Sequence, residues 1–217
     1  MNQYTGAIFD MDGVLFDTEH IYQETWREIA ADMGVTLDDG ITQAISGTNG
    51  DVMCRVIERF YGVADGTDIM NRCKARVREK LSREVPVKPG AREIIGYFKE
   101  KGVRVAVASS STRGQIVSNL ALSGLTDSID AVVSGEEVSK GKPDPEIFLR
   151  AAAALGCAPE ECFVFEDSMS GVRAGHAAGC ATIMVPDLIP PTPDILPLCF
   201  RVYDSLCDAL EAIRGME

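Results

Sequence analysis

Residues 4–13 read Tyr4-Thr5-Gly6-Ala7-Ile8-Phe9-Asp10-Met11-Asp12-Gly13, a short apolar run that ends abruptly in two acids. The run predicts a strand over Tyr4–Phe9. Because it is apolar throughout rather than alternating, it is typical of a parallel sheet that is covered on both faces. The stretch therefore favours an α/β fold with a polar edge that begins at Asp10.

Further apolar runs predict more strands of the same sheet. Apolar residues at helical spacing separate them, for example Ile94, Ile95 and Phe98. This alternation implies right-handed crossovers, so the sequence predicts a doubly wound, Rossmann-like parallel sheet. The strands are expected at Val103–Ala108, Ala131–Ser134, Cys162–Phe165 and Ala181–Val185, and a closing helix at Ser205–Arg214.

The chain between the first two strands is too long for one crossover and has the pattern of helices only. It predicts an inserted all-helical cap domain over residues 18–86, within a core domain of residues 1–17 and 87–217. Helices are expected from Glu19 onward, at Asp51–Tyr61 and at Thr67–Ser82.

The composition excludes several classes of partner. Among 217 residues, 33 are acidic and 21 basic, which gives a formal net charge of −12 and disfavours nucleic acid and anionic membranes. Seven cysteines without a Cys-x-x-Cys pair, and only two histidines, argue against a zinc site. With no apolar run of signal-peptide or membrane-helix length, we expect a reduced, cytoplasmic protein.

Polar side chains follow the predicted strands where each strand ends. The carboxyl ends of parallel strands meet at one edge of the sheet, where ligands bind. Acids gathered there would repel one another unless a cation lay among them, and oxygen donors without histidine or cysteine favour Mg²⁺. The candidates are Asp10, Asp12, Ser109, Lys142, Glu166 and Asp167.

The spacing of Asp10 and Asp12 suits a two-carboxylate reaction. Residues two apart on an extended chain point to the same side, and Gly13 then lets the chain turn away. One carboxylate can attack phosphorus while the other handles the proton of the leaving group. An acidic loop cap is the alternative for an isolated Asp-x-Asp, but the other edge residues favour the catalytic interpretation.

A run of hydroxyls begins at Ser109 and Ser110, between a strand and a helix. Hydroxyls and free backbone amides at a helix N-terminus bind phosphate oxygens, and this predicts a phosphate site. Simple capping of the helix by Ser111 or Thr112 is the structural alternative.

Lys142 is the expected cation of the site. It precedes Pro143, which favours an extended conformation in a short loop at the sheet edge. Lys140 is the competing candidate. After the fourth strand, Glu166 and Asp167 are expected to ligate metal, although Asp167 or Ser168 could instead cap the next helix.

Four motifs follow one another along the chain: Asp10–Glu19, Val107–Ser110, Lys142–Pro145 and Glu166–Gly171. In sequence and order they resemble those of haloacid dehalogenase-like hydrolases, most of all the branch with β-phosphoglucomutase and small sugar-phosphate phosphatases. The resemblance covers essentially the whole chain. It implies a Mg²⁺-dependent phosphatase that acts on a small phosphorylated metabolite, such as a sugar phosphate, through an aspartyl-phosphate.

The resemblance also implies a role for each site residue. Asp10 is the nucleophile and Asp12 the general acid and base, while Ser109, Ser110 and Lys142 hold the phosphoryl group. The implied metal ligands are Asp10, Asp12 through its backbone carbonyl, Glu166 and Asp167.

Two alternatives stay open, a β-phosphoglucomutase-like phosphomutase and a phosphate-binding or receiver-like signalling module, and the cap sequence disfavours the first. A phosphomutase of the same branch carries a cap histidine and a cap arginine, and here Tyr22 and Gly50 stand in their places. A receiver-like signalling module also combines acids, a hydroxyl and a lysine, but it has no such insert. We expect a monomer or a weak homo-oligomer.

Overall fold

The computed structural model describes residues 4–45, 48 and 50–215. The chain divides into two compact units, one formed by Met1–Asp17 with Val85–Glu217 and the other by Thr18–Glu84. The first unit contains the sheet and the second is helical.

The sheet is parallel throughout and has the strand order β3-β2-β1-β4-β5-β6. This confirms the predicted doubly wound α/β fold. The last strand was missed because a two-residue segment carries no periodicity. The strands are β1 Gly6–Phe9, β2 Arg104–Ser109, β3 Ala131–Ser134, β4 Cys162–Glu166, β5 Ala181–Met184 and β6 Arg201–Val202.

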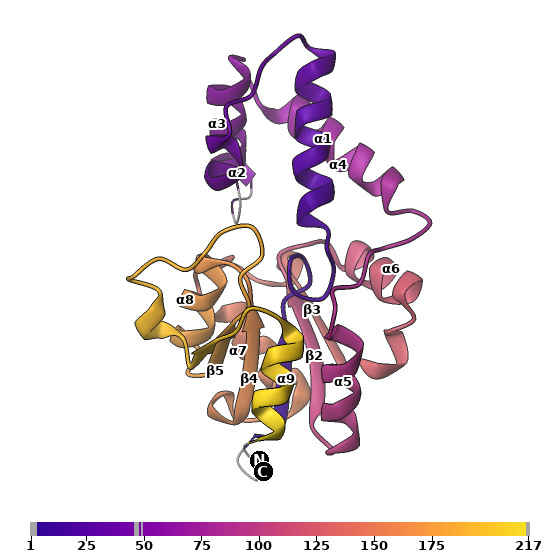
Figure 1. The fold of residues 1–217 in the computed structure, drawn as a ribbon, viewed down its shortest axis with the longest axis vertical. Helices are drawn as coiled ribbons and strands as arrows, with labels where there is room; N and C mark the ends of the chain where they lie inside the picture. The colour runs from indigo at the N-terminus through magenta and orange to yellow at the C-terminus, as the bar shows by residue number, and fades with distance from the viewer. Residues whose placement is uncertain (1–3, 46–47, 49, 216–217) are drawn as a thin grey trace. The chain divides into compact units, whose positions relative to one another are not determined.

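Helices cover both faces of the sheet, as Figure 1 shows for α5 and α9 on the near side and α7 behind the strands. On the near face, Phe98 of α5 packs against Phe9 and Phe165, with ring centroids 6.2 and 6.0 Å away. On the other face, α7 packs on β1, β2 and β3. The helices of this unit are α5 Ala91–Glu100, α6 Arg113–Ser123, α7 Glu146–Leu155, α8 Met169–Ala177 and α9 Leu206–Arg214.

The inserted unit is all-helical, as predicted. Its helices are α1 Glu19–Asp32, α2 Gly40–Ile45, α3 Gly50–Tyr61 and α4 Thr67–Lys80. Trp26 is buried, and its carbonyl accepts a hydrogen bond of 2.6 Å from the Tyr61 hydroxyl. Helix α2 was not predicted, because six residues are too few to establish a helical period.

The two chain segments that lead into and out of the insert lie side by side in the sheet unit. Phe16 and Val87 form an antiparallel bridge. On either side of it, the Asp17 amide donates to the Pro86 carbonyl at 2.8 Å and the Lys88 amide to the Leu15 carbonyl at 2.9 Å. Both connections therefore start from one fixed point beside β1.

The strand order reverses between β1 and β4, and in open α/β sheets the crevice at such a reversal binds ligands.

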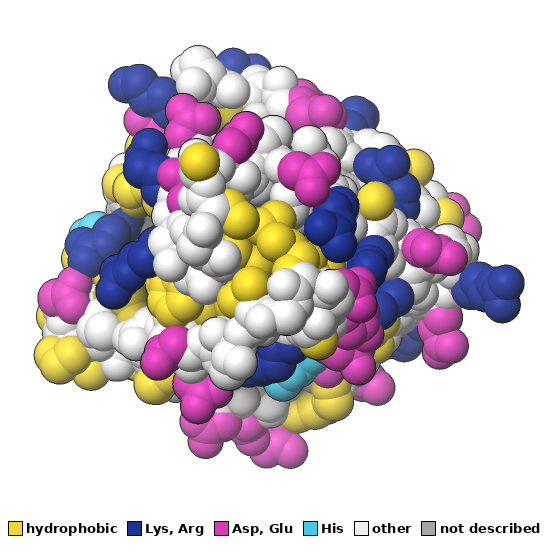
Figure 2. Space-filling view, turned by 90° about the horizontal axis from the view of Figure 1, so that it is seen from above, with side chains coloured by type: hydrophobic (Ala, Val, Ile, Leu, Met, Phe, Trp, Pro, Cys, Tyr) yellow, Lys and Arg dark blue, Asp and Glu magenta, His cyan; other side chains and the backbone are white. Residues whose placement is uncertain are grey.

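On the face seen in Figure 2, basic and acidic side chains are intermixed. Within the described part of the chain, no helix combines the length and the apolar character that a membrane crossing requires.

Candidate active site

Asp10 directly follows β1, beside the end of β4. Its amide donates to the Phe165 carbonyl at 2.9 Å, and its side chain is 10% exposed. The chain then turns back on itself, since the amides of Leu15 and Phe16 both donate to the Met11 carbonyl. The buried β1 strand therefore fixes Asp10 at the reversal of the sheet.

Gly13 completes this turn at φ +82°, in the left-handed region that favours glycine. A Cβ added here would lie 2.4 Å from Asp167 Oδ2. The Asp167 carboxylate thus lies directly against the loop of Asp10 and Asp12, which brings acids from the ends of two strands together.

Lys142 reaches the same place from the loop before α7. Its ammonium pairs with Asp10 Oδ1, with Glu166 Oε1 at 2.5 Å, and with the Ala108 carbonyl at 3.4 Å. The Lys142 side chain is only 6% exposed. Lys140, the competing candidate, is 75% exposed and its nearest ion-pair partner is Asp144 at 3.9 Å. Lys142 is therefore the lysine of this cluster.

Glu166 is fully buried as the last residue of β4. While Oε1 faces Lys142, Oε2 accepts hydrogen bonds from the Ser168 amide at 3.0 Å and the Ser168 hydroxyl at 2.9 Å. A Cβ on Gly171 would overlap the Glu166 carboxylate, so any other residue there would displace it from its partners. Both Glu166 oxygens already have partners within the protein, one of them the Lys142 ammonium.

A hydroxyl that the sequence suggested only as a helix cap orients Asp12. The Ser111 hydroxyl donates to Asp12 Oδ2 at 2.9 Å, and the Ser111 carbonyl accepts from the Ser134 hydroxyl at 2.8 Å. Ser109 is the buried last residue of β2, and its hydroxyl oxygen accepts from the Ser111 amide at 3.1 Å. Ser110 is exposed. The run of hydroxyls pointed to this turn but not to the member that contacts Asp12.

The structure also resolves which residues cap the helices after β2 and β4. Thr112 caps α6 and forms a capping box with Gln115. Ser168 caps α8 by accepting from the Gly171 amide at 3.0 Å. Asp167 is therefore not the cap of α8, and its carboxylate lies at the acidic cluster.

The cluster carries more negative than positive charge. Burial raises the pKa of Asp10 to about 8; the Lys142 ammonium opposes this shift, and the Glu166 and Asp12 charges add to it. Burial disfavours the charged form of Lys142, but Asp10 and Glu166 outweigh it and raise the Lys142 pKa above its usual range. Carboxylate oxygens with excess negative charge match what Mg²⁺ selects, and a dication there would favour ionised Asp10.

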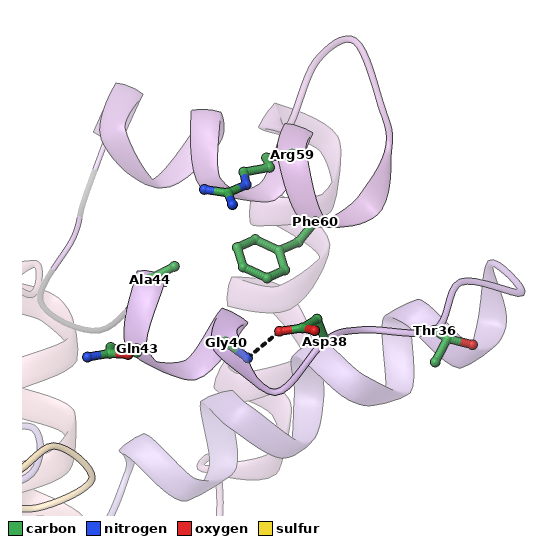
Figure 3. Close-up of a pocket in the computed structure, with 7 residues that line it drawn as sticks. All are labelled: Thr36, Asp38, Gly40, Gln43, Ala44, Arg59 and Phe60. Carbon is green, nitrogen blue, oxygen red and sulfur yellow. Dashed lines mark hydrogen bonds between the residues drawn. The ribbon is translucent and has the colours of Figure 1, made fainter.

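A separate hollow of about 670 Å³ lies in the helical unit, between α2, α3 and the segment before α2. Figure 3 shows Arg59 and Phe60 on one side of it and the Asp38 carboxylate on the other. The Asp38 carboxylate stabilises its own turn, because its Oδ1 accepts a hydrogen bond from the Gly40 amide at 2.7 Å. The acids and the lysine of the cluster described above do not line this hollow.

The model of the haloacid dehalogenase-like hydrolase family matches residues 7–185, a span that includes the whole cluster. The chain belongs to the haloacid dehalogenase-like hydrolases. It is accordingly an enzyme, and the predicted phosphatase class is confirmed.

Several relatives of this haloacid dehalogenase-like hydrolase are similar over most of its length. A phosphorylated carbohydrates phosphatase of Thermotoga maritima is 34% identical over 82% of each chain. Hexitol phosphatase B of Escherichia coli is 33% identical over 85% of this chain and 84% of its own. A family hydrolase of Deinococcus radiodurans, solved with bound phosphate and sodium, has a TM-score of 0.81 and 28% identity, covering 98% of this chain and 96% of its own.

Removing the buried cation tests the charge balance. We expect Lys142→Met to lower the free energy of unfolding by about 3–5 kcal/mol in urea titrations with EDTA, because the buried Asp10 and Glu166 side chains lose the cation that pairs with both. Adding Glu166→Gln should recover part of that loss, since it removes a carboxylate that would otherwise be left without its cation. A Lys142→Met protein as stable as wild type would contradict the ion-pair cluster.

Proposed function

We propose that this hydrolase cleaves the phosphate monoester of a small phosphorylated carbohydrate through a phosphoryl group carried on Asp10. The observation that carries the proposal is the position of Asp10 at the reversal of the sheet, with Asp12 two residues on and the Lys142 ammonium on its carboxylate. The names of the relatives support the substrate class, because two of them act on phosphorylated carbohydrates or hexitols.

In the first step, an Asp10 oxygen attacks phosphorus and forms an O–P bond as the ester P–O bond breaks. The leaving oxygen takes a proton from Asp12, which the Ser111 hydroxyl holds in place at 2.9 Å. Lys142 and the Ser109 hydroxyl bind the phosphoryl oxygens, where positive charge and hydrogen-bond donors stabilise the transferring group. Ser110, exposed at the start of the same turn, is a further candidate contact.

In the second step, Asp12 accepts a proton from water, which attacks the same phosphorus. The Asp10 O–P bond breaks, inorganic phosphate leaves, and both carboxylates return to their starting states. One carboxyl group can serve as acid and then as base because it meets both oxygens at the same position.

Mg²⁺ is the proposed cofactor, held by Asp10, by the Asp12 backbone carbonyl and by Asp167. When bound, it neutralises charge on the phosphate ester and on the acids around it. Glu166 remains a candidate ligand, although its contacts with Lys142 and Ser168 support a role in placing the lysine. No step above requires a histidine or a cysteine.

The helical insert, residues 18–86, is proposed as the cap domain that selects the leaving group. Tyr22 is uncharged at neutral pH, and Gly50 has no side chain. Neither supplies the positive charge that would hold a second phosphate as a phosphomutase must, so transfer of the phosphoryl group to water is favoured. A β-phosphoglucomutase of Bacillus subtilis is 30% identical to this chain, and the mutase remains the alternative to test.

The metal requirement is the first test. Phosphate release from a panel of hexose and hexitol phosphates should require Mg²⁺ and stop with excess EDTA. Asp167→Ala should lose nearly all activity and stay folded by circular dichroism, whereas Asp127→Ala, which removes an exposed acid on the same unit, should behave as wild type. Full activity in EDTA would refute the proposed metal site.

The two aspartates should fail for different reasons. Asp12→Asn should lose about 10²–10⁴-fold in rate, since it loses the general acid and base. Asp10→Asn should be inactive because the covalent route is gone. With the best substrate labelled on phosphorus, rapid quench and peptide mapping should find the label on Asp10 of the wild type. Label on any other residue would overturn the assignment.

The choice between phosphatase and phosphomutase rests on the acceptor of the phosphoryl group. Assayed side by side, with a glucose bisphosphate as primer, phosphate release from sugar phosphates should far exceed conversion of β-glucose 1-phosphate to glucose 6-phosphate. Isomerisation that outpaces phosphate release would reverse this part of the proposal and leave the role of Asp10 intact.

A further inference from the structure

The loop that delivers Lys142 has little regular structure of its own. It runs from the end of a short 3₁₀ turn at Gly135–Glu137 to the start of α7 at Glu146. A lysine side chain is long and flexible, so the position of its ammonium depends on where this loop holds its backbone. The contacts that hold the loop therefore bear directly on the site.

One carboxylate makes three of those contacts. Glu146 Oε2 accepts hydrogen bonds from the Ser139 amide at 2.9 Å, the Ser139 hydroxyl at 2.6 Å and the Lys140 amide at 3.2 Å. These donors lie two and three residues before Lys142. The Glu146 backbone meanwhile closes the other side of the loop, where its amide donates to Asp144 Oδ1 at 3.1 Å.

The second oxygen of Glu146 is held from the next turn of α7. Arg150 Nε and Nη2 both donate to Oε1, at 2.9 and 2.7 Å. The Ser139 hydroxyl first, and Arg150 after it, lower the pKa of Glu146 to about 2. The carboxylate is thus ionised at neutral pH, and its hydrogen bonds with the loop are charge-assisted.

We propose that Glu146 is a positioning residue for Lys142: it fastens residues 139 and 140 to the first turn of α7 and so sets where the Lys142 ammonium lies between Asp10 and Glu166. Helix α7 packs on three strands of the sheet, one of which is β1. Glu146 therefore ties the loop to a helix that rests on the strand preceding Asp10. For catalysis, this inference rests on the phosphoryl-binding role proposed for Lys142.

A purely structural role for Glu146 predicts something different. An acid in the first turn of a helix, paired with an arginine four residues on, stabilises that helix modestly wherever it occurs. Removing it would then lower thermal stability and leave the environment of Lys142 unchanged. A measurement on the Lys142 side chain itself distinguishes the two roles.

The experiment follows the side-chain ammonium of Lys142 by ¹⁵N NMR in protein labelled on lysine, with Lys142→Met to assign the signal. A buried ammonium paired with two carboxylates exchanges slowly with water and should give a resolved signal in the wild type. Glu146→Ala should broaden or shift that signal. It should also lower kcat on the best sugar phosphate by roughly 10- to 100-fold, the cost of misplacing a group by about an ångström.

Matched variants keep the test decisive. Glu146→Gln retains an acceptor for the loop amides and should rescue both readouts, while Ser139→Ala should shift the signal in the same direction even if Glu146→Ala does not fold. Glu137→Gln removes an exposed partner of Arg113 in the same connection and should change neither readout. An unchanged Lys142 signal in Glu146→Ala and Ser139→Ala would overturn the inference. If Glu146→Ala loses the Lys142 signal but the wild-type protein releases no phosphate from any substrate of the panel, the positioning role of Glu146 stands and only the proposed function is refuted.

Discussion

A single positive charge in a buried place, the ammonium of Lys142 between Asp10 and Glu166, is the interaction on which the rest of this site depends. Burying an unpaired carboxylate is costly, and two adjacent ones also repel each other. With the ammonium in place, both acids can sit at the ends of central strands. Without it, burial would raise the pKa of Asp10 still further.

The sheet topology makes that arrangement possible. Strands β1 and β4 are neighbours although most of the chain separates them in sequence, so the residues that follow them emerge side by side. Two glycines permit the close approach: Gly13 leaves space for Asp167, and Gly171 for Glu166. The arrangement of acids at the candidate site is thus set by strand order and by the absence of two Cβ atoms.

The sequence was informative where a buried strand ends in a polar residue. Asp10 and Glu166 could be placed in this way, because a parallel strand is apolar to its last residue and its carboxyl end faces the site. Ser111 could not, since all hydroxyls of one turn look alike until the backbone of that turn is known. Glu146 escaped for a related reason: an acid followed by arginine four residues later is common on exposed helices. Very short elements such as β6 and α2 carry too few residues for any period to emerge.

The bridge between Phe16 and Val87 bears on how the helical insert can change during evolution. Because the insert leaves and re-enters the sheet unit across one antiparallel bridge, its length and composition impose no strain on the strand order. Helices can be gained, lost or exchanged there as a block, while the residues that follow β1 keep their positions in the sheet unit. Under the proposed cap role, substrate preference can change in the helical segment while the residues proposed to carry the reaction, on the sheet unit, stay the same.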